Sequence, residues 1–361
     1  MIWFFIKKSI FKSEPMLKTE SRQLSGKRNE YISFAKSYAI ITIVIYHFCM
    51  PLPLSDVMSK IIGLGGGGVH LFIFASGFGL FLSNYINYKI FFKKRISKVL
   101  IPYYVIITFI FIFNLLIPLF SDGLYAYLSH IFLYKMFIEK YEGSFGGQFW
   151  FISTIIQFYL IYPLLVKAVN KYNSLLCLLS GIIISLTYSI VISLKGYGDV
   201  RVVNSFFIQY LWEFVLGMVV AKENLIGKLI NLKWYSALML AIAGYSIMAI
   251  LVLEFGDFGR NINDIFSFIG YISMSVFVYN IAKIYKNVML LIQRIEPISY
   301  PLFLTHTFVY VLCVKYLFSQ ITLIYIPVVF LIALIVANLV NMLLNRVYKT
   351  PKGKTSIQLI P

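Results

Sequence analysis

The sequence predicts an all-α protein: a polytopic membrane helix bundle with about ten transmembrane helices and both termini cytoplasmic. Three observations predict it. Of the 361 residues, 60% are hydrophobic and 13% are charged, and the mean hydropathy is +0.83. Apolar stretches of about 20 residues, enough to cross a hydrocarbon core about 30 Å thick, recur along the whole chain. The charged residues, which give a net charge of +18, lie mostly between these apolar stretches. They form no basic face on a soluble module, so no nucleic-acid partner is expected.

Ten segments have the length and composition of membrane spans. They are residues 34–52, 61–83, 99–120, 149–167, 174–194, 204–221, 234–254, 264–282, 298–318 and 321–345. They form one membrane domain, 34–345, between basic cytoplasmic tails at 1–33 and 346–361. With both tails inside, 24 of the 32 Lys and Arg residues lie in or beside inward segments and 7 in or beside outward loops, and Lys36 lies within the first span. This asymmetry predicts a multi-pass protein of the cell inner (cytoplasmic) membrane.

The three cysteines, Cys49, Cys177 and Cys313, fall within or beside apolar stretches, without a CxxC pair or a Cys/His cluster. This spacing indicates neither a disulfide framework nor a zinc site. We therefore expect buried structural thiols and no bound metal.

The first span contains two ionisable side chains, Lys36 and His47. Eleven helical residues make three turns plus a small remainder, so the two lie on nearly the same face, about 16 Å apart along the axis. An ionisable group at membrane depth is a candidate functional site, and histidine is the side chain best suited to accept a proton near neutral pH. The alternatives are a helix-packing hydrogen bond for His47 and a snorkelling interface anchor for Lys36.

A cluster of basic residues precedes the third span, just before Pro102. It comprises Lys89, Lys93, Lys94, Arg95 and Lys98. An ordinary positive-inside loop would look the same. The functional alternative is that Arg95 and Lys98, three residues apart and thus on one helical face, hold the phosphates of a cytoplasmic donor.

Two outward segments have unusual composition. Residues 124–137 form an amphipathic patch in the longest outward loop, either lying in the membrane interface or serving as a plain connector. The glycine run at 65–68 suits close backbone approach and lacks the Lys-Ser/Thr of a phosphate-binding loop. His130 lies in the amphipathic patch and is given no role.

Six segments in order carry a resemblance to a known family. They are NEYISFAKSYAIITIVIYH at 29–47, VHLFIFASGFGLFL at 69–82, FFKKRISKVLIPYY at 91–104, FWFISTIIQFYLIYPLL at 149–165, LWEFVLGMVVA at 211–221 and ISYPLFLTH at 298–306. Together they resemble the acyltransferase 3 family of integral membrane acyltransferases. The resemblance implies O-acyl transfer, commonly O-acetylation, from cytoplasmic acyl-CoA to a sugar hydroxyl of a cell-envelope or exported glycan or its lipid-linked precursor.

The resemblance also assigns residues. The family's first-span motif, an arginine and a histidine separated by ten residues, maps onto Lys36 and His47. Lysine keeps the positive charge of the arginine but lacks its planar guanidinium group. The family's serine-glycine-aromatic motif maps onto Ser76, Gly77 and Phe78. On this basis His47 is the expected catalytic residue, either deprotonating the acceptor hydroxyl or briefly carrying the acyl group. The residues expected to bind acetyl-CoA or another acyl-CoA are Lys36, Ser76, Arg95 and Lys98.

Other positions are expected on the acceptor side or depart from the family. Residue type and predicted side assign Trp150 and Gln148 to cover the sugar by stacking and hydrogen bonding. His306 matches a histidine of the family and is expected either to orient the acceptor or to pack between helices. His70 stands where many members have an acidic residue, and is expected to be a polar substrate contact, a pH-sensitive partner or a satisfied helix-end histidine. Many glycan-modifying members have paired glutamates where this chain has isoleucines, at 155–156.

Two other functions fit a ten-span bundle. A glycan or lipid transporter has cavity-facing polar residues too, although no repeat relates the two halves. A noncatalytic membrane subunit that kept the fold would explain the missing arginine and glutamates. The expected partners are the glycan or lipid-linked sugar acceptor and membrane lipids; the sequence does not fix the oligomeric state.

Overall fold

The computed structural model describes residues 30–83, 87–318 and 322–348. Within them every regular element is helical. The longer helices are α3 (Glu30–Cys49), α5 (Gly68–Leu82), α6 (Tyr88–Leu116), α8 (Trp150–Lys171), α9 (Ser174–Leu194), α11 (Leu211–Lys222), α13 (Trp234–Ile262), α14 (Asp264–Ile284), α16 (Ser299–Tyr316) and α17 (Ile326–Tyr348). The shorter α-helices are α4 (Asp56–Gly63), α7 (Leu124–Ile131), α10 (Arg201–Asn204), α12 (Ile226–Ile230) and α15 (Lys286–Gln293). The 3₁₀ turns are η1 (Leu64–Gly67), η2 (Lys135–Phe137), η3 (Glu139–Tyr141), η4 (Gly147–Phe149), η5 (Glu296–Ile298) and η6 (Leu323–Tyr325).

The predicted helical membrane bundle is confirmed. Among the described residues, nine helical segments are long and apolar enough to cross a membrane. They are Glu30–Cys49, Asp56–Leu82, Tyr88–Leu116, Gly147–Lys171, Ser174–Leu194, Trp234–Ile262, Asp264–Ile284, Lys286–Tyr316 and Leu323–Arg346. Most of tail 1–33 and of tail 346–361 lies outside the described residues, and the orientation of the termini stays a prediction.

The sixth expected span, residues 204–221, differs from the prediction. The chain there forms the four-residue α10, an irregular turn and the twelve-residue α11. At about 1.5 Å per residue α11 is about 18 Å long, too short to cross the hydrocarbon core alone. Its apolar sequence reflects burial inside the bundle, because α11 packs along α5 and α9.

Glycines permit the close crossing of α5 and α11. A Cβ atom on Gly77 would lie 2.1 Å from the carbonyl oxygen of Phe214, and one on Gly217 would lie 2.1 Å from that of Phe74. Small residues at a helix interface let two backbones approach this closely. The glycine run at 65–68 similarly packs η1 and the start of α5 against α3, as expected.

The third span begins earlier than expected. Helix α6 starts at Tyr88, capped by the Asn87 side chain, which accepts a hydrogen bond from the Ile90 backbone N–H at 3.2 Å. The basic cluster at 89–98, expected in a loop, therefore lies on the first turns of a membrane helix. Arg95 and Lys98 remain on one face of that helix.

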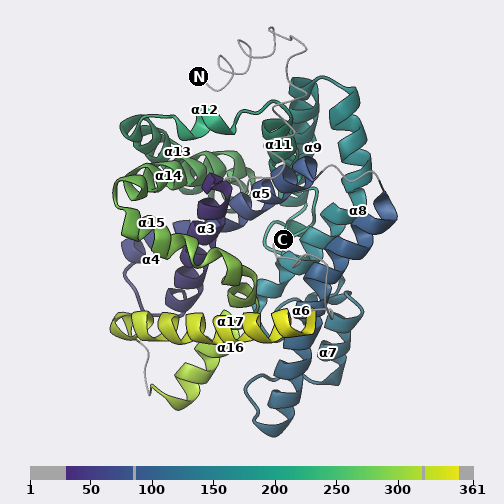
Figure 1. Ribbon diagram of the computed structural model, residues 1–361, viewed down its shortest axis with the longest axis vertical. Helices are drawn as coiled ribbons and strands as arrows, with labels where there is room; N and C mark the ends of the chain where they lie inside the picture. Colours follow the sequence, from purple (N-terminus) through teal and green to yellow (C-terminus); the bar gives the residue numbers. More distant parts are fainter. Residues whose placement is uncertain (1–29, 84–86, 319–321, 349–361) are drawn as a thin grey trace.

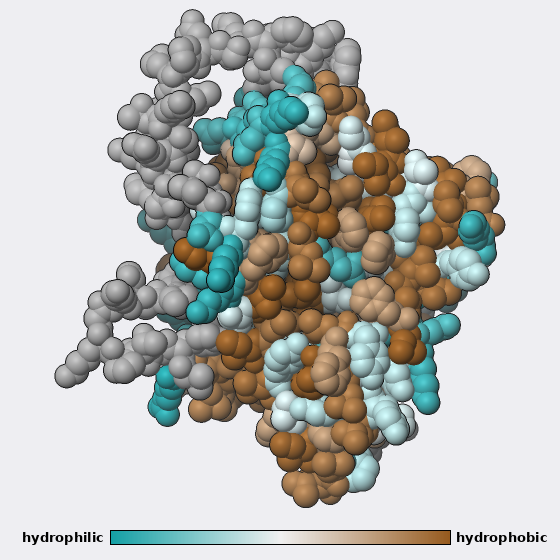
Figure 2. Space-filling view, turned by 90° about the vertical axis from the view of Figure 1, so that its right-hand side faces the viewer, coloured by the Kyte–Doolittle hydropathy of each residue, from teal (hydrophilic) through white to brown (hydrophobic). Residues whose placement is uncertain are grey.

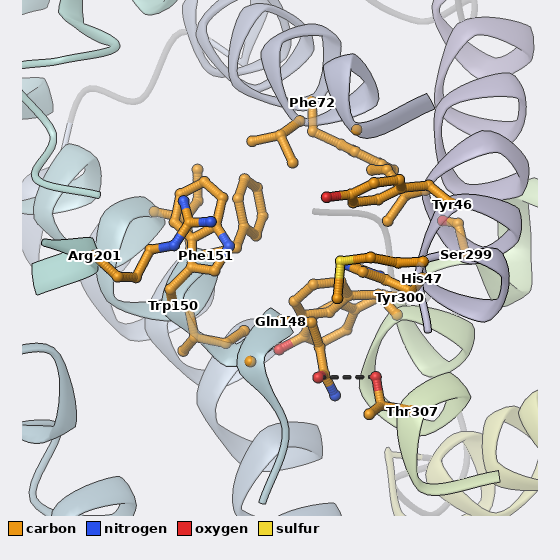
Figure 3. Close-up of a pocket in the computed structure, with 18 of the residues that line it drawn as sticks. Tyr46, His47, Phe72, Gln148, Trp150, Phe151, Arg201, Ser299, Tyr300 and Thr307 are labelled. Atoms are coloured by element: carbon orange, nitrogen blue, oxygen red, sulfur yellow. Dashed lines mark hydrogen bonds between the residues drawn. The ribbon is translucent and has the colours of Figure 1, made fainter. Parts of the chain in front are cut away.

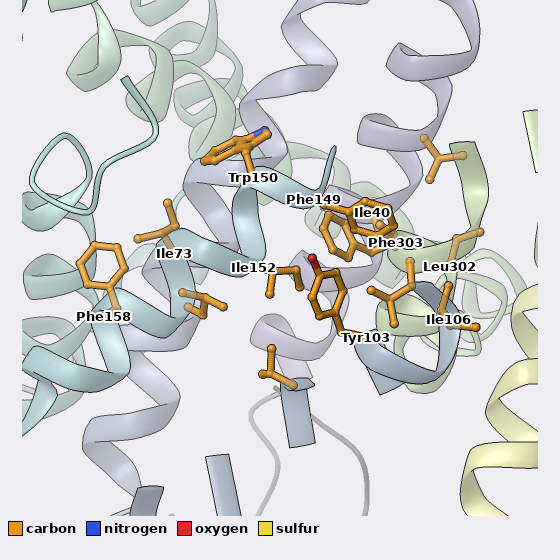
Figure 4. Close-up of a cluster of buried hydrophobic side chains, with 14 of the residues drawn as sticks. Ile40, Ile73, Tyr103, Ile106, Phe149, Trp150, Ile152, Phe158, Leu302 and Phe303 are labelled. Atoms are coloured by element: carbon orange, nitrogen blue, oxygen red, sulfur yellow. The ribbon is translucent and has the colours of Figure 1, made fainter. Parts of the chain in front are cut away.

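The arrangement puts α3 at the centre. This helix is the most buried of the candidate spans and contacts α5, α14, α16 and α17, whereas α13 is the least buried. In Figure 1, α13 and α14 lie side by side on one flank, and α6, α7 and α8 on the other. Figure 4 shows the buried core between these groups, where Ile40, Phe149, Ile152 and Phe303 converge.

The outer surface is largely apolar, as lipid contact requires. Figure 2 shows apolar side chains covering much of one face, with hydrophilic groups concentrated toward its edges. The amphipathic patch at 124–137 contains α7 and η2, and its position in the membrane interface stays a prediction. Within it Tyr125 and Phe132 are exposed, and His130 and Lys135 are buried. Of the cysteines, Cys49 and Cys313 are buried as expected, and Cys177 is half-buried.

Candidate active site

A cavity of about 590 Å³ lies between α3, α5, α8, α10 and α16. Six of the nine predicted site residues line it: Lys36, His47, His70, Ser76, Gln148 and Trp150. These residues come from three separate parts of the chain. The cavity therefore brings together residues predicted to bind the donor and residues predicted to bind the acceptor. Figure 3 shows His47 and Tyr46 on one side of this space, and Trp150 and Arg201 on the other.

His47 is hydrogen-bonded to His306, which stands on the neighbouring α16. The His47 Nδ1 and His306 Nε2 atoms are 2.9 Å apart, and the rings stack with centroids 5.0 Å apart and planes at 17°. His306 does not line the cavity; it is fully buried behind His47. The hydrogen bond considered for helix packing is therefore present, and His47 rather than His306 faces the substrate space, so His306 would act on the acceptor only through His47.

The hydrogen bonds around His306 assign the tautomers of both rings. Its Nδ1 lies 3.1 Å from the carbonyl oxygen of Leu302 and 2.9 Å from that of Phe303. A carbonyl only accepts, so the proton of a neutral His306 sits on Nδ1, and Nε2 accepts from His47 Nδ1–H. A neutral His47 then carries its free lone pair on Nε2, and the described residues offer that ring no second hydrogen bond.

Lys36 lines the same cavity about three helical turns before His47. Its side chain is only 7% exposed. A snorkelling anchor would hold its ammonium group at the surface, so this burial favours a role inside the bundle. Ser76 also lines the cavity, and its Oγ donates to the carbonyl oxygen of Phe72 at 2.8 Å.

Gln148 and Trp150 stand where η4 leads into α8. The Gln148 Oε1 accepts a hydrogen bond from the Thr307 hydroxyl at 2.9 Å (Figure 3). Its Nε2 is buried and has no hydrogen-bond partner among the described residues. The Trp150 ring stacks on Tyr210, with centroids 5.8 Å apart and planes at 26°. An aromatic platform and an unused amide donor therefore border the cavity.

Arg201 is a cavity residue that the sequence argument counted only as an outward-loop charge. It begins α10, and its guanidinium lies 5.2 Å from the centroid of the Trp150 ring. Sequence reasoning missed it because no local pattern connects it to Trp150.

His70 is paired with an acidic residue that the sequence argument also missed. Its Nδ1 lies 2.7 Å from Oε1 of Glu213 on α11. The Glu213 side chain is 0% exposed, and its Oε2 has no hydrogen-bond partner among the described residues. A glutamate inside the apolar LWEFVLG stretch could have been identified by the rule that selected His47, since ionisable groups at membrane depth are rarely incidental.

Arg95 and Lys98 do not line the cavity. They lie on the first turns of α6, immediately before Val99, which does line it. The Val99 carbonyl oxygen accepts a hydrogen bond from the Tyr300 hydroxyl at 2.7 Å, and Tyr300 is itself a cavity residue. The basic pair therefore adjoins the cavity lining at Val99 and does not itself line the cavity.

His130, which was given no role, links the segment after α6 back to that helix. The Tyr103 hydroxyl lies 2.7 Å from its Nδ1 and the Ser144 hydroxyl 2.8 Å from its Nε2. Burial, together with the nearby charge of Lys135, holds the pKa of His130 well below its usual value. Burial also lowers the pKa of Lys135 to about 7. These groups do not line the cavity.

Comparison with known proteins gives one match. A family model described as an acyltransferase domain matches residues 29–342, which span all of the helices that form the cavity. No curated protein and no solved structure matches the chain.

Proposed function

The chain belongs to the acyltransferase 3 family of membrane acyltransferases, and from that premise we propose that it moves an acyl group, most simply acetyl, from cytoplasmic acyl-CoA to a sugar hydroxyl of a cell-envelope or exported glycan. One observation carries the proposal: a single cavity holds a buried lysine, a histidine with a free ring nitrogen, and an aromatic platform. The three suit a charged donor, a proton transfer and a sugar, respectively.

The donor fits the end of the cavity that contains Lys36. Acyl-CoA carries phosphates at one end and a thioester at the other. Arg95 and Lys98 would neutralise phosphates beside that end, while Lys36 lines the passage of the thioester arm. Lys36 and His47 are about 16 Å apart along α3, so the arm would extend through the cavity to reach the histidine.

At His47 the chemistry follows from its Nε2 lone pair. In direct transfer, Nε2 removes the proton of the sugar hydroxyl as its oxygen attacks the thioester carbonyl. A C–O bond forms, the C–S bond breaks, and the proton passes to the departing thiolate. In the alternative route Nε2 attacks the thioester carbonyl, an N–C bond forms, the C–S bond breaks and CoA leaves as the thiolate. The sugar hydroxyl oxygen then attacks the acyl group, a C–O bond forms, the N–C bond breaks, and the hydroxyl proton passes to the thiolate. Both routes need the Nε2 lone pair of His47 to be free and the thioester carbonyl of the donor to lie close to it.

The acceptor fits the opposite side of the cavity. The Trp150 ring, which packs against Tyr210 and the Arg201 guanidinium, borders the space for a sugar, and Gln148 Nε2 offers a hydrogen bond to one of the sugar hydroxyls. The excess of basic residues in the amino-terminal tail and in the segments expected to face inward supports the cytoplasmic membrane, with the amino terminus cytoplasmic. That orientation would bring the donor from the cytoplasm and the glycan from outside.

The test is mass spectrometry of envelope polysaccharide and glycolipid from a deletion strain complemented with wild type, His47→Ala or Lys36→Ala. We expect a 42 Da increment on a sugar (the mass of one acetyl replacing hydrogen) in the wild type, loss of it in His47→Ala and a reduced amount in Lys36→Ala. His130→Gln is the matched control, because it removes a histidine that does not line the cavity. An acylation profile that is unchanged by His47→Ala at equal protein level would refute the mechanism.

A further inference from the structure

We infer that Arg201 makes the acceptor side of the cavity selective for a glycan with an anionic group, a carboxylate or a phosphate, close to the acylated sugar. The inference rests on the proposed function and deepens it by naming the substrate class. Arg201 would be a specificity residue for the acceptor and not part of the acyl-transfer machinery.

The first observation behind this inference is the position of the Arg201 guanidinium. It lies 5.2 Å from the centroid of the Trp150 ring, and Trp150 is stacked in turn on the buried Tyr210. Packing on an aromatic face restricts the planar guanidinium, and its N–H groups donate to no other side chain or backbone group among the described residues. Figure 3 shows this pair across the cavity from His47.

The charge of Arg201 has no counter-ion among the residues that the structure describes. The nearest acidic residue in sequence, Asp199, is instead ion-paired with Arg260, which also contacts Asp257 at 3.0 Å. Arg201 forms no ion pair with any carboxylate among the described residues. A guanidinium held at a substrate cavity without a counter-ion is suited to receive one from the substrate, and its fork matches a carboxylate or phosphate.

Gln148 provides a second, independent donor. Its side chain is 4% exposed and lines the same cavity, and its Oε1 is occupied by Thr307. Its buried Nε2 has no partner among the described residues. A buried donor without a partner is costly, so the arrangement favours a bound acceptor atom. A neutral sugar hydroxyl would satisfy Gln148 alone, whereas an anionic sugar satisfies both groups.

An acidic side chain at the same cavity constrains the geometry. Glu142 lines the cavity, and its Oε2 is buried without a partner among the described residues. A carboxylate there would repel an anion bound directly against it and would accept a hydrogen bond from a sugar hydroxyl. The anion therefore belongs at Arg201, and the neutral part of the glycan at Glu142.

The first experiment identifies the charge of the acceptor. Oligosaccharides are released from the strain complemented with wild type, Arg201→Gln, Arg201→Lys or Arg260→Gln, and are separated by anion exchange before mass spectrometry. We expect the 42 Da increment on an anionic oligosaccharide, at least about tenfold less of it in Arg201→Gln, and partial retention in Arg201→Lys. Arg260→Gln removes the same charge outside the cavity lining and should match wild type. A neutral acylated sugar, or equal acylation in Arg201→Gln, would overturn the inference; no increment in the wild type would instead refute the proposed function.

The second experiment separates recognition from folding. The glycan is de-O-acetylated with mild alkali and used as acceptor for purified wild type and Arg201→Gln. Its anion is removed in one arm by carbodiimide reduction of carboxylates and in another by aqueous hydrogen fluoride, which cleaves phosphodiesters. In the arm that removes the relevant anion, wild type should lose about tenfold in kcat/KM, and Arg201→Gln should lose nothing further. Equal losses for both proteins, or no loss for wild type in either arm, would overturn the inference.

Discussion

The Nδ1 atom of His47 donates to the Nε2 atom of His306 across 2.9 Å, and this bond determines which nitrogen of His47 is free for chemistry. His306 can accept because its own Nδ1–H is committed to the carbonyl oxygens of Leu302 and Phe303. The backbone of α16 thus fixes the tautomer of a side chain on α3. His306 is a positioning residue for the proposed reaction, since it does not line the cavity.

The first prediction tests this relationship. His306→Ala should lower kcat about 100-fold and leave the acceptor KM near the wild-type value, because the general base loses its preferred tautomer but the binding groups remain. His306→Gln should recover part of the rate, since an amide oxygen can accept the same hydrogen bond. Release of CoA thiol by purified protein with de-O-acetylated glycan measures both.

Thr305→Val is the matched control for His306. Thr305 is a buried neighbour on α16 whose hydroxyl donates to the Pro301 carbonyl oxygen at 2.9 Å, and it does not line the cavity. Its substitution should change kcat little. If His306→Ala matched wild type in kcat and in the pH dependence of the rate, the tautomer argument would be wrong.

The second prediction concerns Lys36, where the family has arginine. Lys36→Met should reduce kcat/KM for acyl-CoA about tenfold, because the passage loses its buried positive charge, while Lys36→Arg should stay within about threefold of wild type. Lys60→Met, on the exposed α4, is the control. Initial rates at varied acetyl-CoA concentration decide the question. Equal kcat/KM in Lys36→Met and wild type would exclude a donor role for Lys36.

Much of the architecture could be predicted from the sequence, because hydropathy and helical periodicity are local. The eleven-residue step from Lys36 to His47 sufficed to predict one shared face, and both side chains do line the same cavity. The exception was the segment 204–221, which the sequence predicts to be a membrane span. A buried twelve-residue helix has the same apolar composition as a membrane span, so composition could not reveal that α11 is short.

The partners within the site could not be predicted, because they depend on tertiary packing. His47 and His306 are 259 residues apart in sequence, and His70 and Glu213 are 143 apart. No periodicity relates residues on different helices. Arg201 was read only as a topology signal, and its packing on Trp150 depends on how α10 folds against α8.

The third prediction concerns the His70–Glu213 pair. His70→Leu should lower the free energy of unfolding by about 3–5 kcal/mol, because it leaves a buried carboxylate without its partner. Substituting both residues by leucine should recover most of that loss, since the uncompensated charge is then gone. Denaturant unfolding of the four proteins in detergent gives the coupling. Additive losses from the two single substitutions would contradict a stabilising pair.

The fourth prediction uses His130, which lies outside the membrane-spanning segments. The low pKa of His130 in the folded protein arises from burial and from the nearby charge of Lys135, whereas an unfolded histidine has a pKa of about 6.5. Below about pH 6.5 the unfolded chain therefore binds a proton that the folded protein does not, so stability falls as the pH falls. The apparent melting temperature of the detergent-solubilised wild type should drop more between pH 7.5 and pH 5.5 than that of His130→Gln, which lacks the titrating group. Both proteins retain the other three histidines, so the difference between the two drops isolates His130. A drop of the same size in both would show that His130 does not control the acid sensitivity of the folded protein.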